Sequence, residues 1–210
     1  MSLSPALFTP YRDRYLPLLE RLAGLFDKMD QAYGEVAARY GFHCSGCVDN
    51  CCLTRFHHHT LLEYLCLFEA MRTLPSAERR MIGEAVRTVT ERTAAADARG
   101  EALRIMCPLN SEGRCRIYPH RPMICRLHGI PHELRRPDGR VNRQPGCDAF
   151  FAQCRRGGKR DYVSFDRTPF YRQMAQLEQA LRQAMGFDRK IKLTIAEMLA
   201  TMPQDTHEID

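Results

Sequence analysis

The sequence predicts a mainly α-helical protein whose helices surround an irregular, cysteine-rich middle. Apolar residues recur at helical spacing in residues 11–40, 60–74 and 168–185, and this periodicity fails in the middle of the chain. A chain of 210 residues can bury a hydrophobic core that is stable without disulfides, so its ten cysteines need another explanation. We expect one domain over residues 1–210, with a cysteine-cluster core at about 44–147.

The N-terminal half predicts three helices. Residues 11–40 form one long amphipathic helix that Gly41 ends, and residues 60–74 form a densely apolar core helix. Ser76 is placed to cap a third helix. The Ala-rich, polar stretch 93–100 is the best candidate for a helix end or a hinge.

The middle of the chain, residues 107–154, predicts irregular structure rich in Gly, Pro, Cys and Arg. The pair Asp138-Gly139 suits a tight turn between two short strands at 132–136 and 140–144. A segment with so little apolar patterning must be ordered by something other than a core.

Residues 168–202 predict two further helices. Thr168 followed by Pro169 is typical of a capped helix start with proline in the first turn. Thr194 and Glu197 have the spacing of a capping box at the start of a short last helix.

The N-terminus has no basic segment followed by an apolar stretch and a small-residue cleavage site. The apolar runs are also far shorter than the roughly 20 residues needed to cross a bilayer. We therefore expect a cytoplasmic protein without a membrane span. In that reducing compartment, clustered cysteines more often bind metals or do redox chemistry than form disulfides. The alternative is an exported scaffold joined by disulfides.

Eight cysteines have the spacing of metal ligands. The first four form a C-x2-C-x3-C-C cluster, and the other four are spread along the irregular middle. Thiolates are soft ligands, which narrows the metal to zinc, an iron–sulfur cluster or Cu(I) and excludes magnesium and calcium. The predicted ligands are Cys44, Cys47, Cys51, Cys52, Cys107, Cys115, Cys125 and Cys147.

The adjacent residues Cys51 and Cys52 are informative because neighbouring side chains point in different directions. Either one of them is spare, or the two serve different metals or different corners of a cluster. Cys66 lies at helical spacing from Leu62 and is predicted to be a core residue, and the role of Cys154 is open.

The second cysteine set lies in a distinctive motif. Cys107-Pro108-Leu109 is followed by Gly113-Arg114-Cys115-Arg116-Ile117-Tyr118-Pro119-His120-Arg121-Pro122-Met123-Ile124-Cys125-Arg126. Together with the first cluster, this run resembles the YkgJ-type cysteine-cluster family, which is described as a zinc- or iron-chelating domain. The resemblance covers about residues 44–147. It implies metal chelation by cysteine and does not supply a reaction.

Two arginines of this motif, Arg121 and Arg126, are predicted to lie behind the ligands. There they could donate hydrogen bonds to the thiolates or balance their charge, or form ordinary surface ion pairs. The histidines of the run His57–His59, at a predicted helix start, are reserve ligands. So is His128, which lies three residues after Cys125, a spacing that puts both on one helix face.

Charge is concentrated in residues 114–160, where twelve Arg and Lys against three acids give +9 in a chain of net charge +6. This segment could bind nucleic acid, compensate a thiolate site, or form a solvated arginine-rich surface. The sequence thus predicts a thiolate protein with one or two iron–sulfur, iron or zinc centres and a redox or metallo-catalytic role. The alternative is a zinc-stabilised module whose basic segment contacts nucleic acid or a protein.

Overall fold

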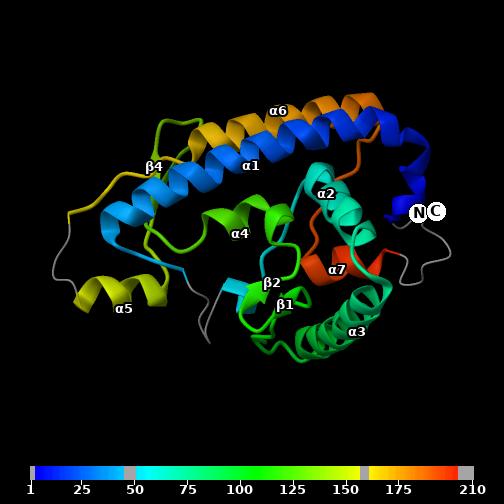
Figure 1. Ribbon diagram of the computed structural model, residues 1–210, viewed down its shortest axis with the longest axis horizontal. Coiled ribbons are helices and arrows are strands. Elements are labelled where there is room, and N and C mark those ends of the chain that lie inside the picture. Colours follow the sequence, from blue (N-terminus) through cyan, green and yellow to red (C-terminus); the bar gives the residue numbers. More distant parts are fainter. Residues whose placement is uncertain (1–2, 45–50, 157–160, 203–210) are drawn as a thin grey trace.

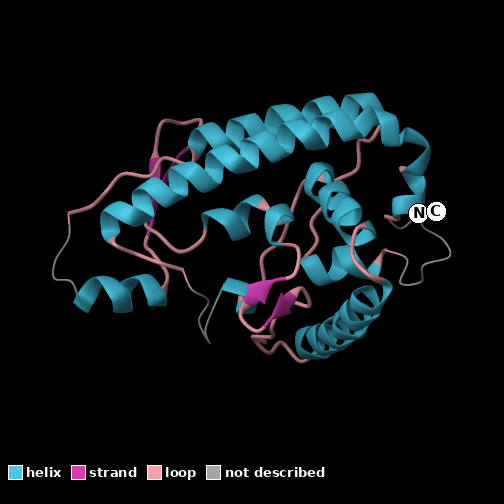
Figure 2. Cartoon of the chain, viewed as in Figure 1, coloured by secondary structure: helices cyan, strands magenta, loops and turns pink. Residues whose placement is uncertain are grey.

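The computed structural model describes residues 3–44, 51–156 and 161–202, which form a mainly α fold (Figure 1). The described part contains seven α-helices: α1 (Arg12–Tyr40), α2 (Leu61–Arg72), α3 (Ser76–Ala98), α4 (Met123–Leu127), α5 (Asp148–Arg156), α6 (Thr168–Met185) and α7 (Ile195–Ala200). Two antiparallel pairs of strands accompany them: β1 (Asn110–Ser111) with β2 (Arg114–Cys115), and β3 (His132–Arg135) with β4 (Val141–Gln144). Short 3-10 turns lie at Pro5–Leu7, Thr9–Tyr11, Cys51–Leu53 and Tyr118–His120. The fold class predicted from the apolar spacing is confirmed (Figure 2).

The two longest helices of the upper layer are α1 and α6, which lie side by side and run in opposite directions (Figure 1). Helix α1 ends as predicted, because Gly41 adopts a left-handed conformation (φ 62°) that closes the last turn. Its buried stripe includes Leu22, Phe26 and Met29, which are at most 2% exposed. The layer of α1 and α6 lies above the cysteine-rich segment in the view of Figure 1.

Helix α2 lies beneath α1 and α6 and is buried on nearly all its faces, as its dense apolar sequence predicts. Thr60 caps it by accepting a hydrogen bond from the backbone N–H of Glu63. Glu178 of α6 reaches the same helix start, and its two carboxylate oxygens accept hydrogen bonds from the N–H groups of Leu61 and Leu62, each at 2.9 Å. Glu178 therefore links α6 to the start of α2.

We expect Glu178→Gln to lower the free energy of unfolding by about 2–3 kcal/mol. A glutamine accepts at only one of the two positions, so one buried N–H of α2 loses its partner, and the ion pair with Arg182 (2.5 Å) is lost. Urea denaturation measures the change. Glu35→Gln, the same substitution on the exposed face of α1, should stay within about 0.5 kcal/mol of the unmodified chain. Equal stability of the two variants would contradict this account of Glu178.

Two predicted helix starts were wrong by one residue. Helix α3 is capped by Pro75, and Ser76 is already its first helical residue. Helix α6 is capped by Arg167, while the hydroxyl of Thr168 accepts a hydrogen bond from the backbone N–H of Arg135 at 2.7 Å. In both cases the preceding residue makes the turn, so the hydroxyl is left to make other contacts or to face solvent.

The C-terminal ends of the helices agree better with the sequence. Helix α3 continues without a break through the stretch predicted as a helix end or hinge and ends at Ala98, just before Gly100.

The capping box of α7 is present, with Thr194 accepting from the N–H of Glu197 and the Glu197 carboxylate accepting in return. Helices α3 and α7 pack against each other as a lower layer.

The middle segment is more ordered than predicted. The hairpin β3–β4 is confirmed, with Gly139 at φ 82° in its turn. The prediction of irregular structure up to residue 154 was wrong for α5, which begins at Asp148. The sequence does not predict this helix because a helical spacing of apolar residues cannot repeat over many turns in only nine residues. Of the described helices, none combines the length and apolar character needed to cross a bilayer.

Candidate metal centre

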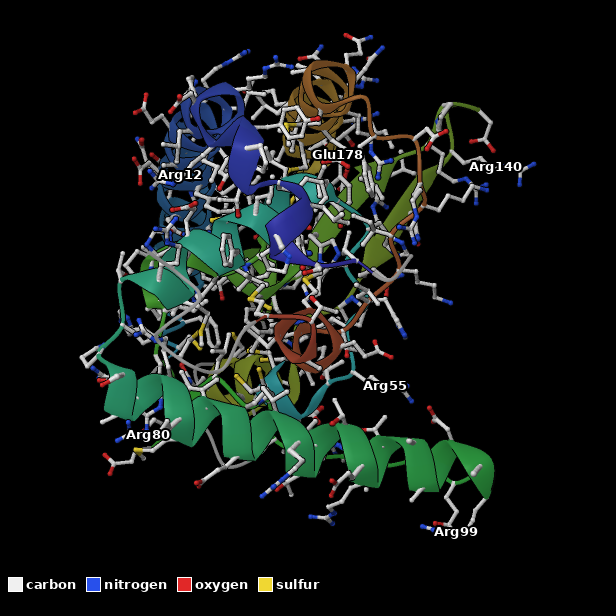
Figure 3. The ribbon with its side chains drawn as sticks, turned by 90° about the vertical axis from the view of Figure 1, so that its right-hand side faces the viewer. Arg12, Arg55, Arg80, Arg99, Arg140 and Glu178 are labelled. Carbon is white, nitrogen blue, oxygen red and sulfur yellow. The ribbon has the colours of Figure 1, made fainter. Side chains whose placement is uncertain are left out.

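The predicted ligands come together around one cavity of about 1090 Å³ between the upper and lower layers. Figure 3 shows the sulfur atoms gathered between α3 and the pair α1 and α6. Seven of the eight predicted cysteines line this cavity: Cys44, Cys51, Cys52, Cys107, Cys115, Cys125 and Cys147. The eighth, Cys47, lies outside the described residues. Cysteines far apart in sequence therefore share one enclosed space.

The two remaining cysteines lie elsewhere. Cys66 is only 7% exposed in α2, which confirms the prediction of a core residue. Cys154 lies on α5 and packs against the core without lining the cavity. No disulfide joins any two of the nine cysteines that the structure describes.

Backbone hydrogen bonds join the two cysteine segments. The N–H of Cys107 donates to the carbonyl of Cys52 at 2.9 Å, and the carbonyl of Cys107 accepts from the N–H of Asn110 at the same distance. Strand β1 then turns back into β2, which pairs Asn110 with Cys115. The tight β1–β2 turn thus returns Cys115 to the cavity wall that Cys107 already occupies.

Cys125 and Cys147 are placed by the short helices that follow. Pro122 starts α4, and the carboxylate of Glu63 in α2 accepts the N–H of Met123 at 2.9 Å, which fixes α4 against the core. The N–H of Cys147 donates to the carbonyl of Gly129 at 2.8 Å, just before α5 begins. Both cysteines therefore lie in or beside rigid elements rather than in free loops.

The charges of the thiols divide them into two adjoining groups. Cys107, Cys115 and Cys125 each lie close enough to Cys52 for its charge to act on their pKa. We call these four the first thiol group. Cys44, Cys51 and Cys147 all act on the pKa of Tyr33, and we call these three the second thiol group. The charges of Cys52 and Cys125 act on the pKa of Cys51 more strongly than that of Cys44, so Cys51 links the two groups.

The neighbours Cys51 and Cys52 share a hydrogen bond that separates their pKa values. This bond lowers the pKa of the Cys52 thiol to about 6, with further help from the side chain of Asn110, and it raises the pKa of Cys51. Cys52 is therefore the more acidic thiol of the pair. Asn110 was missed by the sequence analysis, since nothing in its sequence context marks it as a thiol partner.

The other thiols of the first group are buried. Burial raises the pKa of Cys107 to about 12 and raises those of Cys115 and Cys125 as well. Backbone N–H groups oppose this effect, that of Leu109 for Cys107 and that of Ile117 for Cys115. In the second group the N–H of Phe150 donates to the sulfur of Cys147 at 3.4 Å. Such donors stabilise a thiolate whether or not a metal is bound.

The described ranges contain no set of three or more His, Cys, Asp or Glu side chains placed to hold a single metal ion. The fold brings the cysteines to the wall of one cavity, but it does not place three or more of the described ones around a single metal position.

Arg126 and Arg121 lie beside the first thiol group. Arg126 is 4% exposed, with its guanidinium 4.0 Å from the ring centre of Phe26, and it donates to Asp30 and to the carbonyl of Pro119. Arg121 lies over the ring of Tyr118, 3.5 Å from its centre. The charges of both arginines lower the pKa of the Cys115 thiol, which opposes its burial.

The histidines lie differently from the prediction. The helix expected after the histidine run begins only at Leu61, and His58 is buried in a bridge to Leu193. His128 does not share a helix face with Cys125, because α4 ends at Leu127 and His128 is extended. His58 and His128 nevertheless line the cavity.

In the part of the basic segment whose side chains the structure describes, most arginines are paired with acids of the same chain. Of its eight arginines whose side chains the structure describes, seven form ion pairs and only the exposed Arg114 has none. The pairs are Arg116 with Glu78, Arg121 and Arg126 with Asp30, Arg135 with Asp166, Arg136 and Arg140 with Asp138, and Arg143 with Glu133. At the hairpin tip, Arg140 extends away from the body (Figure 3).

The buried histidines make folding sensitive to acid. Burial and the charge of Arg167 lower the pKa of His132 to about 4, from an ordinary 6.5. The unfolded chain therefore binds a proton that the folded chain rejects, so stability is full above pH 6.5 and falls toward pH 4. We expect His132→Gln to flatten the decline of the melting temperature between about pH 6.5 and 5. An unchanged slope would contradict this role of His132.

Searches with protein-family models, among curated proteins and among solved structures find no match to this chain.

Proposed function

We propose that this protein binds one or two metal centres through cysteine thiolates, as an iron–sulfur cluster or iron with a redox or metallo-catalytic role. Zinc is the alternative metal. The observation that carries the proposal is the gathering of seven cysteines, from segments as far apart as Cys44 and Cys147, around a single cavity. A chain of this length does not need disulfides to be stable, so stability does not explain why so many thiols lie in one place.

The residues around the cavity suit such a centre by type and number, and binding would have to draw their side chains together, since no three described ligands converge on one metal position. The four thiols of the first group match the number of ligands of a four-cysteine zinc site or an iron–sulfur cluster. Burial favours the protonated forms of Cys107, Cys115 and Cys125, and a bound metal would favour their thiolate forms by taking the place of the protons. Arg121, Arg126 and the N–H donors then offset the negative charge that the thiolates carry.

The second thiol group would hold the second centre. Cys44, Cys51 and Cys147 supply three thiols around Tyr33, and Cys47 remains a ligand predicted from the sequence alone. When bound, an iron–sulfur cluster would supply one-electron transfer, and zinc would supply structure or Lewis acidity. The resemblance to the YkgJ-type family implies the same chelating chemistry. Free thiols also agree with a cytoplasmic location, which we include in the proposal.

The nucleic-acid alternative is less well supported. The arginines that would form a polyanion-binding face are mostly paired with acids of the same chain, as the ion pairs of the basic segment show. Among the described arginines of this segment, pairing leaves few that could replace counterions on a phosphate backbone. We therefore do not extend the proposal to nucleic acid.

The test is purification without oxygen from cells supplied with iron and zinc, followed by elemental analysis and an absorption spectrum. An iron–sulfur centre predicts a brown protein containing iron and acid-labile sulfide, and the alternative predicts a colourless protein containing zinc. Protein that contains neither metal, yet is folded by circular dichroism, would contradict the proposal.

A further inference from the structure

The cavity extends well beyond the thiol groups. Its other end is lined by residues 53–56, by the second half of α3, by residues 103–105 and by the start of α7. On α3 the lining residues run from Val89 to Asp97, which is about 12 Å along the helix axis. We call this part the α3 end of the cavity.

Contacts that involve no thiol hold these segments around the α3 end. Arg55 donates to the two carboxylate oxygens of Asp97, at 2.6 and 2.8 Å, which joins residues 53–56 to α3. Figure 3 shows Arg55 between α7 and the C-terminal half of α3, and the two helices pack against each other. On the side toward α4, the ring of Phe56 contacts that of His128, with 5.5 Å between their centres. The α3 end is therefore enclosed by segments that are tied to one another.

The wall of the α3 end is apolar, and its side chains are not used in the core. Five half-buried apolar residues line it: Leu53, Phe56, Val89, Leu103 and Ile105. None of these five belongs to the described hydrophobic core or packs against it. They therefore present apolar surface to the cavity, and a ligand that removed this surface from water would be bound favourably.

The charged side chains that these segments contribute to the cavity wall are already engaged within the chain. Arg55 and Asp97 neutralise each other, and the carboxylate of Glu197 accepts a hydrogen bond from the N–H of Thr194 at 2.7 Å. Arg114, which also lines the cavity, adjoins the first thiol group instead. A charged ligand at the α3 end would lose its hydration and meet no free counter-charge from these segments, so a neutral ligand is favoured.

We propose that the α3 end of the cavity binds a neutral, apolar small molecule beside the thiols. The cavity volume of about 1090 Å³ is that of a large small-molecule pocket, so it leaves room for such a ligand next to the cysteines. This site goes beyond the proposed metal binding, because it rests on the apolar wall and not on a bound metal.

The test is calorimetric titration of the whole protein, purified without oxygen and with its metal content measured. The probe is 1-octanol, and its controls are octanoate and octylammonium, which carry the same chain with a negative or a positive charge. We expect octanol to bind saturably with a negative heat capacity change, and both ions to bind at least about tenfold more weakly. Absence of saturable octanol binding, or equal binding of either ion, would overturn the proposal.

Two substitutions in α3 locate the site. Val89→Glu puts a charge into the apolar wall and should weaken octanol binding at least about tenfold. Met81→Glu adds the same charge to the same helix at a residue that is 55% exposed and outside the cavity, and octanol binding should stay unchanged.

A third variant keeps the test decisive if Val89→Glu does not fold. Leu103→Ala removes apolar contact from a different segment of the wall and should weaken octanol binding about tenfold. Unchanged binding in the folded variants of the wall would place octanol elsewhere and refute the site. Octanol binding by protein without metal would count against the proposed function alone, and metal-containing protein that binds no octanol would count against this inference alone.

Discussion

Replacing Cys125 by serine is expected to remove the metal of the first thiol group, which is about half of the total if two centres are present. Cys125 is half-buried in α4, and the charges of Cys107, Cys115 and Cys52 all act on its pKa, so it belongs to the first thiol group. A serine hydroxyl is a hard, weakly acidic donor and does not replace a thiolate on a soft metal. Because metal binding is coupled to folding, the melting temperature should fall as well.

The matched control is Cys66→Ser, the same change at a cysteine that is buried in α2 outside the cavity. It places a hydroxyl in the core and should cost about 1–3 kcal/mol of stability while the metal content stays unchanged. Metal analysis and urea denaturation on both variants separate the two effects. Full metal content in folded Cys125→Ser would show that this thiol is not a ligand.

Serine at Cys51 and at Cys52, made separately, is expected to remove different centres. Cys52 belongs to the first thiol group with Cys107 and Cys115. Cys51 belongs to the second thiol group, whose charges act on the pKa of Tyr33. Cys52→Ser should therefore lose the same metal as Cys125→Ser, and Cys51→Ser should lose the remainder. Element-specific analysis of each variant, with its absorption or electron paramagnetic resonance spectrum, compares the two losses.

The double variant Cys52→Ser with Cys125→Ser checks the division further. Two ligands of one centre should lose no more metal together than either loses alone. If Cys51→Ser and Cys52→Ser lose the same metal to the same extent, the division of the thiols into two groups is wrong, and one centre spans the cavity.

The sequence was sufficient for the long helices because their apolar spacing continues over many turns. Helix α1 ends at Gly41, where a left-handed residue was expected, and the Thr194 capping box is present. The starts of α3 and α6 were displaced by one residue, since a hydroxyl next to a proline can be the cap or the first helical residue. Such choices depend on tertiary contacts, such as the bond from Arg135 to Thr168.

The sequence also identified which cysteines gather, because their types and spacing already suit metal chemistry. It could not divide them, since the division depends on how α4 and the β1–β2 turn place Cys125 and Cys115 around the cavity.

The most direct test of the central claim is X-ray absorption spectroscopy at the metal edge of protein purified without oxygen. We predict a first shell made of sulfur at about 2.3 Å, supplied by the cavity cysteines. The sulfur signal should weaken in Cys125→Ser and persist in Cys66→Ser. A first shell of nitrogen and oxygen alone would contradict the account, because the metal would then be bound somewhere other than the thiol groups.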